Sequence, residues 1–103
     1  MSTPENAQNP NAPSSRAIIT IIGADRVGII AGVTAAIAEA NVNILDISQS
    51  VIRDFFTMIM MVDLGQSPLT FHELSKRLAE RGEKLGVKIE IQREEIFKAM
   101  HRI

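Results

Sequence analysis

The sequence predicts an α+β domain of the ferredoxin-like class, βαββαβ, with a four-stranded antiparallel sheet, two helices on one face and a short C-terminal helix. Three observations lead to this prediction. Four segments carry apolar residues in strand patterns, two carry them at helical spacing, and the two kinds follow one another in the split βαβ order. Right-handed crossovers would place both helices on the same sheet face. The opposite face therefore needs another cover, either the C-terminal helix or a second subunit.

The first strand is expected over residues 17–22, whose sequence AIITII is almost entirely apolar. A run of this kind is typical of a central strand that is covered on both faces. Because successive side chains alternate between the faces of a sheet, either Ile18 and Ile22 or Ile19 and Ile21 must point away from the helices. Exposed apolar residues of this kind usually mark a surface that contacts a partner.

The first helix is expected to follow a loop flanked by Gly23 and Gly28, and to run for about three to four turns. Its buried stripe, at spacings of three and four, would consist of Ile30, Val33, Ile37 and Ala40. Asp25 would lie near the helix start, where a carboxylate can accept backbone N–H bonds. The sequence leaves open whether Asp25 is only a helix N-cap or also contacts a ligand.

The second and third strands are expected to form a hairpin with a tight turn at Arg53 and Asp54. The second strand, residues 43–53, is half polar, as an edge strand would be. Its apolar face would hold Leu45, Ile47 and Val51, and its polar face Asp46, Ser48 and Ser50. The third strand, residues 55–64, has one uniformly apolar face that must be core. That face consists of Phe56, Met58, Met60, Val62 and Leu64.

Thr70 and Glu73 match the two halves of a capping box, which places the start of the second helix at about Phe71. Gly86 fits the left-handed position that ends a helix, whereas Gly82 inside the helix costs about 1 kcal/mol relative to alanine. The buried stripe of this helix would consist of Phe71, Leu74, Leu78 and Leu85.

The chain is expected to end with a strand and a short helix. Strict alternation predicts one buried strand face, made of Val87, Ile89 and Ile91. Residues 94–103 place acids first and bases last, as a short helix would, and one side of that helix would hold Ile96, Phe97 and Met100. Residues 1–15 contain three of the four prolines and predict a flexible arm. The expected domain is therefore residues 16–103, with the C-terminal helix included.

Composition excludes several classes of function. At 103 residues the chain is one domain, and without cysteine it has no disulfide framework, thiolate metal site or thiol nucleophile. Its two histidines, His72 and His101, are far apart, so neither a metal nor a cofactor is expected. A net charge of −1, with no basic tract among the four phenylalanines, argues against nucleic acid. Without an apolar run of about 20 residues or a signal peptide, no membrane partner is expected, and the cytoplasm is the expected compartment.

Residues suited to catalysis are sparse, and an enzyme is not expected. Ser48 and Ser50 are best explained as the solvated side of an edge strand. The segment GADRVG lacks the features of a Walker loop or a dinucleotide-binding fingerprint. It nevertheless offers backbone N–H groups at a helix start, which suit a carboxylate. Asn43 is either a turn residue or helix C-cap, or lies within reach of a partner at the sheet edge.

Three segments, GADRVGIIAGV, NVNILDISQS and FFTMIMMVDL, together resemble the ACT domain, the small regulatory module that binds amino acids in many metabolic enzymes. The chain looks most like the short stand-alone ACT proteins of bacteria and archaea, and the resemblance covers Arg16 to about Gln92. It implies a homodimer whose protomers pair side by side through their sheets and hold an amino acid at the junction. The implied site residues are Ala24, Asp25, Arg26, Val27 and Gly28 of the first loop, with Asn43 and Ile44 of the second strand.

The sequence differs from many ACT domains at three positions in or directly before the first loop. Gly23 stands where some serine-binding members have histidine, and Val27 stands where proline is common. Asp25 replaces a neutral asparagine and would pair with a ligand ammonium group. The expected function is a non-enzymatic regulatory module that passes ligand occupancy to a regulated enzyme or regulator. The alternative is a structural protein–protein interaction subunit with no small-molecule ligand.

Overall fold

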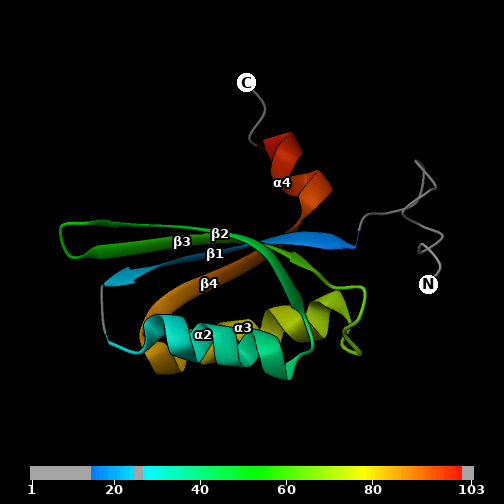
Figure 1. The fold of residues 1–103 in the computed structure, drawn as a ribbon, viewed down its shortest axis with the longest axis horizontal. Coiled ribbons are helices and arrows are strands. Elements are labelled where there is room, and N and C mark those ends of the chain that lie inside the picture. Colours follow the sequence, from blue (N-terminus) through cyan, green and yellow to red (C-terminus); the bar gives the residue numbers. More distant parts are fainter. Residues whose placement is uncertain (1–14, 25–26, 101–103) are drawn as a thin grey trace.

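The computed structural model describes residues 15–24 and 27–100. Seven elements follow one another along the chain: β1 (Arg16–Ala24), α2 (Ile29–Glu39), β2 (Asn43–Ile52), β3 (Phe55–Asp63), α3 (Phe71–Leu85), β4 (Val87–Arg93) and α4 (Glu94–Met100). Figure 1 shows α2 and α3 together on one side of the sheet, with α4 on the other side. The predicted ferredoxin-like fold with a short additional helix is therefore confirmed.

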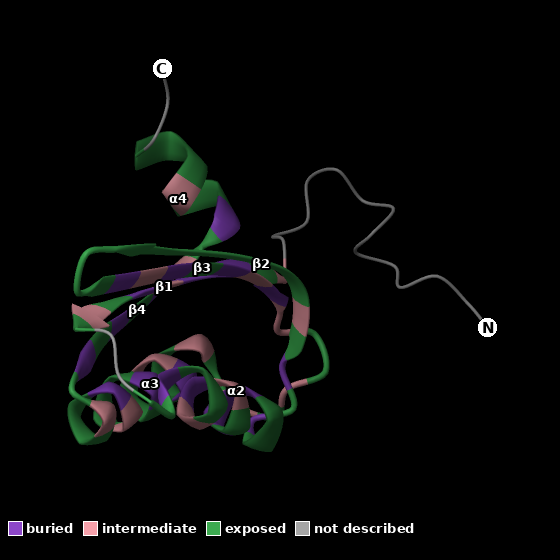
Figure 2. Cartoon of the chain, turned by 60° about the vertical axis from the view of Figure 1, so that its left-hand side comes forward, coloured by how far each residue is buried: buried purple, intermediate pink, exposed green. Residues whose placement is uncertain are grey.

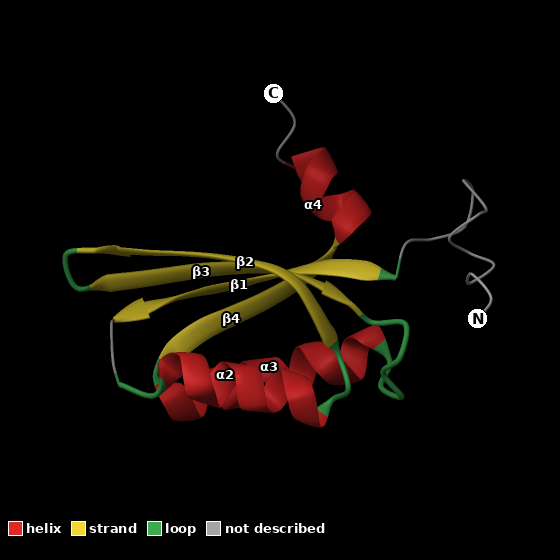
Figure 3. Ribbon diagram, viewed as in Figure 1, coloured by secondary structure: helices red, strands yellow, loops and turns green. Residues whose placement is uncertain are grey.

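The four strands form one antiparallel sheet in the order β2-β3-β1-β4 (Figure 3). The first strand is central, between β3 and β4, and the half-polar second strand is an edge, as predicted. Along β1 the register pairs Arg16 with Asp63 at one end and Ala24 with Phe55 at the other. The two connections that contain α2 and α3 therefore cross the same sheet face, since both crossovers are right-handed.

The core lies between this face and the two long helices, as the burial colours of Figure 2 show. Alternate residues of the strands point into it, and the β3 set is the predicted one: Phe56, Met58, Met60 and Val62 are buried, and Leu64 packs against them from just beyond the strand. On β1 the inward residues are Ile19 and Ile21, which leaves Ile18 and Ile22 on the other face. This result decides between the two alternatives for the first strand.

The predicted buried stripe of α2 is wrong at its first residue. Ile30 is 43% exposed, whereas Ile29 is only 2% exposed and faces the core with Val33, Ala36 and Ile37. The helix begins at Ile29, directly after Gly28. A buried stripe that starts at Ile29 and one that starts at Ile30 both continue through Val33 and Ile37. Spacing alone therefore could not separate the two phases.

Strand β2 contains a β-bulge that the sequence pattern did not reveal. The register with β3 shifts between Ile44 and Asp46, so Leu45 is the additional residue and is exposed. Beyond the bulge the predicted alternation holds, because Ile47 lies opposite the buried Met60.

Helix α3 begins with the predicted capping box. The Thr70 Oγ1 accepts the Glu73 backbone N–H at 3.0 Å, and the Glu73 carboxylate accepts the Thr70 N–H at 2.8 Å. The second of these bonds is the main reason that the pKa of Glu73 lies below its ordinary value. The helix ends at Gly86, whose φ of 75° is left-handed, as predicted.

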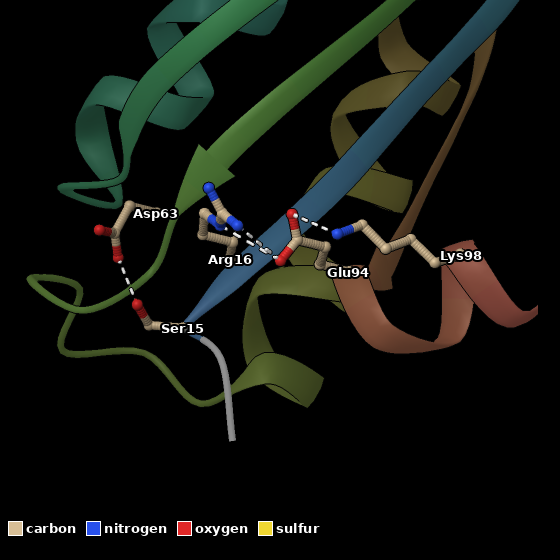
Figure 4. Close-up of polar contacts among 5 residues, drawn as sticks. All are labelled: Ser15, Arg16, Asp63, Glu94 and Lys98. Carbon is tan, nitrogen blue, oxygen red and sulfur yellow. Dashed lines mark hydrogen bonds and ion pairs between the residues drawn. The ribbon is translucent and has the colours of Figure 1, made fainter. Parts of the chain in front are cut away.

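Polar contacts fix the start of β1 to the end of β3 on one side and to the start of α4 on the other (Figure 4). The Ser15 Oγ donates to Asp63 Oδ1 at 2.8 Å, and the Ser15 carbonyl accepts the Leu64 N–H at 2.8 Å. Arg16 Nη2 lies 3.0 Å from the carboxylate of Glu94, which is buried at the start of α4. The folded part of the chain therefore includes Ser15, one residue before the boundary expected from composition.

We propose that residues 1–14 are dispensable for folding, because their sequence is polar and rich in proline. A chain that starts at Ser15 should melt within a few degrees of the full chain. As a comparison, Ser15→Ala in the full chain removes the hydrogen bond to Asp63 and should cost about 1 kcal/mol. Thermal unfolding followed by circular dichroism measures both, and a loss of more than about 10 °C in the truncated chain would contradict the proposal.

Candidate ligand-binding site

The loop after β1 is open and reaches α2 through a left-handed glycine. Ala24 is the last residue of the strand, Val27 is fully exposed, and Asp25 and Arg26 lie outside the described residues. Gly28 is the N-cap of α2 with a φ of 91°, and among the described residues no atom beyond its two chain neighbours lies within 4 Å of the position a Cβ would take. Gly28 therefore occupies the N-cap position of α2, and the role of Asp25 stays a prediction.

Among the described residues, no side chain caps the start of α2. Gly28 has no side chain to offer, and the first turn carries no acidic residue. The first helical bond runs from the Gly32 N–H to the Gly28 carbonyl at 2.8 Å. The N–H groups of the first turn precede this bond, and such groups favour an anion such as a carboxylate.

Asn43 is the first residue of β2, where it pairs with Asp63 and is exposed. It is neither a turn residue nor the C-cap of α2, because Ala40 is the C-cap and Asn41, with a φ of 57°, makes the turn. Ile44 is half-buried and packs against the core, which agrees with the packing role that the resemblance implies for it. Both residues are thus held by the sheet rather than by a loop.

A shallow depression of about 450 Å³ lies beside Asn43. It is lined by Ala38, Asn41, Val42, Asn43 and Gln66. The Asn41 Nδ2 donates to the Gln66 carbonyl at 2.9 Å and holds this rim in place. Sequence reasoning did not include Asn41 or Gln66 in the candidate site. An asparagine directly after a predicted helix end was the available signal for Asn41, since asparagine tolerates the left-handed conformation.

Within one chain the two halves of the candidate site lie far apart. Ala24 and Asn43 are aligned with Phe55 and Asp63, the two ends of β3. At about 3.3 Å per residue, the nine residues of that strand separate them by about 26 Å. A single protomer therefore does not bring the first loop and Asn43 together.

The other candidates for chemistry do not form a cluster. Ser48, Ser50 and His72 are exposed on β2 and α3. Among residues 15–24 and 27–100, no group of three His, Cys, Asp or Glu side chains could hold a metal ion. In the same part of the chain, no helix is long and apolar enough to cross a membrane.

Comparison with known proteins decides the family. A family model described as the ACT domain matches residues 15–92, most of the chain. This chain belongs to the ACT domain family. The match spans the whole sheet except the last residue of β4, together with α2 and α3. ACT domain proteins are regulatory, so this membership agrees with the kind of function expected from the sequence.

Relatives of this ACT domain occur in both bacteria and archaea. It is 53% identical over 88 residues to a UPF0237 protein of Listeria monocytogenes, a match that covers 85% of this chain and 99% of that protein. It is 48% identical over 89 residues to a UPF0237 protein of Methanopyrus kandleri, which covers 86% of this chain and 99% of that protein. These relatives are therefore little longer than one ACT domain.

The solved structure of an ACT domain protein from Streptococcus pneumoniae has the same fold. It is 43% identical to this chain, with a TM-score of 0.73, and the match covers 85% of this chain and 99% of that one. The resemblance to the short stand-alone ACT proteins is thus confirmed by sequence and by structure.

Proposed function

We propose that this ACT domain is a cytoplasmic, non-enzymatic regulatory module that binds an amino acid at the junction between two copies of the chain. The observation that carries the proposal is the position of the two site halves at opposite ends of one sheet, next to an edge strand. Neither half is complete alone. A second copy is the simplest source of the missing half, since most homo-oligomers have two-fold symmetry.

Edge pairing would bring the halves together. The outer edge of β2 presents backbone N–H and C=O groups that a second β2 strand can pair with. Two-fold pairing of β2 strands is antiparallel, so Asn43 of one copy lies next to the Ile52 end of the other. Ile52 is aligned with Phe55, and Phe55 with Ala24. The first loop of one copy and Asn43 of its neighbour therefore share one end of an eight-stranded sheet.

Each polar group of an amino acid would have a matching partner in such a junction. The N–H groups at the start of α2, which no described side chain caps, suit the ligand carboxylate, and Asp25 suits its ammonium group. The amide of Asn43 can donate and accept at once. Gly28 leaves open space beside the helix start, and Ile44 supports Asn43 from the core. Occupancy of the junction would then be passed to a regulated enzyme or regulator that contacts the dimer.

The proposal predicts one amino acid that raises the unfolding temperature of the full chain in a screen of all twenty. A ligand at about 100 times its dissociation constant adds about 2.7 kcal/mol of stability. For that ligand, Asn43→Ala should weaken binding about tenfold or more in calorimetry, the scale of a hydrogen bond to a charged group. Its melting temperature without ligand should be unchanged, because Asn43 is exposed.

Gly28 offers a matched pair of variants. Gly28→Val fills the open space and is strained at a φ of 91°, whereas Gly28→Asn is tolerated better in the left-handed region. If the loop binds the ligand, both variants should weaken binding, and only Gly28→Val should also destabilise the free protein. Ligand binding unaffected by Asn43→Ala, Gly28→Asn and Asp25→Ala would locate the pocket elsewhere. A dimer that responds to no amino acid would instead favour a purely structural interaction subunit.

A further inference from the structure

The depression beside Asn43 is built by two loops that meet at one end of the sheet. One loop joins α2 to β2, and the other joins β3 to α3 (Figure 1). Asn41 Nδ2 of the first loop donates to the Gln66 carbonyl of the second at 2.9 Å. Ser67 Oγ of the second loop donates to the Ala40 carbonyl at 2.6 Å. These two hydrogen bonds fix the loops to each other, so the depression has a defined shape.

The lining of the depression is polar but uncharged. Its described residues are Ala38, Asn41, Val42, Asn43 and Gln66. Only the amide nitrogen of Asn41 can donate to the Gln66 carbonyl, which leaves the Asn41 Oδ1 as an acceptor. The side-chain amides of Asn43 and Gln66 make no hydrogen bond to another described residue. The lining therefore offers both donors and acceptors to a ligand.

The acidic side chains closest to the depression along the chain are engaged elsewhere. Glu39 Oε1 lies 3.1 Å from Arg81 Nη2 of α3. Asp63 Oδ1 accepts the Ser15 Oγ–H and the Gly65 N–H, each at 2.8 Å. A charged group that entered the depression would thus find no opposite charge among the described lining residues, and burying such a group unpaired is costly.

Building on the proposed function, we propose that the depression holds the side chain of the bound amino acid, and that this side chain ends in an uncharged amide. Asn43 belongs both to the proposed junction and to the lining, so a ligand held at the junction has the depression beside its side chain. The volume of about 450 Å³ lies within the usual range of about 300–1,000 Å³ for small-molecule sites. Asn41 and Gln66 are then the residues that determine specificity.

An amide matches this lining better than the other ends an amino acid side chain can have. It donates through its nitrogen and accepts through its oxygen, so it can donate to Asn41 Oδ1 and accept from the amide of Gln66. A carboxylate of the same shape only accepts, and therefore loses the first of these bonds. An apolar end makes neither bond and leaves polar groups of the lining without a partner. We therefore expect glutamine or asparagine to be the ligand.

Calorimetry of the full chain with a matched set of amino acids tests this specificity. Glutamine, glutamate and methionine have side chains of similar length that differ in the chemistry of their ends. Alanine carries only the groups that all these amino acids share. Glutamine or asparagine should bind about tenfold or more tightly than glutamate, methionine and alanine, the scale of one or two hydrogen bonds.

Two glutamine replacements form a matched pair of variants. Gln66→Leu removes the side-chain amide but keeps the backbone carbonyl that Asn41 binds. It should weaken binding of the preferred amide about tenfold and leave binding of alanine unchanged. Gln92→Leu makes the same chemical change on β4, away from the described lining, and should leave both affinities unchanged. Circular dichroism verifies that each variant is folded.

A second lining variant decides the question if Gln66→Leu does not fold. Asn41→Gly removes the other amide and suits the left-handed φ of 57°. It should also reduce the preference for glutamine or asparagine over methionine.

The outcomes separate this specificity from the proposed function. Binding of an amino acid that depends on Asn43 but shows no preference for an amide would overturn the specificity and leave the junction site intact. A preference for an amide that both Gln66→Leu and Asn41→Gly leave unchanged would overturn it as well. If no amino acid binds, the proposed function fails and the specificity fails with it.

Discussion

Replacing Met60 with alanine is expected to destabilise the fold by about 2–5 kcal/mol. Met60 is fully buried at the middle of β3, where it lies between Ile19 of β1 and Ile47 of β2. Neighbouring strands and two packed helices cannot close the space that the lost side chain leaves, so the cost of a cavity is added to the lost burial. In a domain of this size the unfolding temperature should fall by at least about 8 °C, and urea unfolding gives the free energy directly.

Ile30→Ala is the control for Met60→Ala. It removes a side chain of similar size from the outer face of α2, where Ile30 is exposed, and should change stability by less than about 1 kcal/mol. If Ile30→Ala were as costly as Met60→Ala, the buried stripe of α2 would start at residue 30 after all. A near-neutral Met60→Ala would mean that β3 is shifted by one residue, with Ile59 and Met61 facing the helices.

The sequence was most informative where two independent signals agree. On β3 strict alternation over four buried residues defined both the strand and its inward face. For α3 the capping box at Thr70 and the left-handed Gly86 defined both ends. The start of α2 had only one signal, apolar spacing, and the phase was missed by one residue. The bulge at Leu45 had no signal, because it depends on how β2 meets β3 and not on the composition of β2.

The candidate site shows a different limit of sequence reasoning. Asn43 could be assigned to the start of a strand, and Gly28 to a tight turn, from local pattern alone. That the two residues lie at opposite ends of the sheet follows only from the register of β1, β2 and β3. The orientation of α4 could not be predicted either. The sequence predicts a seven-residue helix with one apolar side. Such a helix could either lie on the sheet or stand away from it.

Gly82→Ala is expected to destabilise the protein by about 1–3 kcal/mol, although alanine is the better helix former by about 1 kcal/mol. Gly82 is buried on the side of α3 that packs against β4. A Cβ there would lie 2.7 Å from the Val87 carbonyl oxygen and 3.1 Å from Ile89 Cγ1. Because the carbonyl belongs to the backbone of a strand, the contact can be relieved only if α3 moves away from the sheet.

The helical Gly32 separates this close approach from a general effect of glycine replacement. A Cβ at residue 32 would lie 2.8 Å from Leu85 Cδ2, the end of a half-buried side chain that can rotate. Gly32→Ala should therefore be near neutral, or stabilising by up to about 1 kcal/mol through helix propensity. Urea unfolding of both variants gives the comparison. Equal stability of the two would show that α3 and β4 can separate at no cost, and the buried glycine would then be only a weak point of the helix rather than the contact that sets its distance from the sheet.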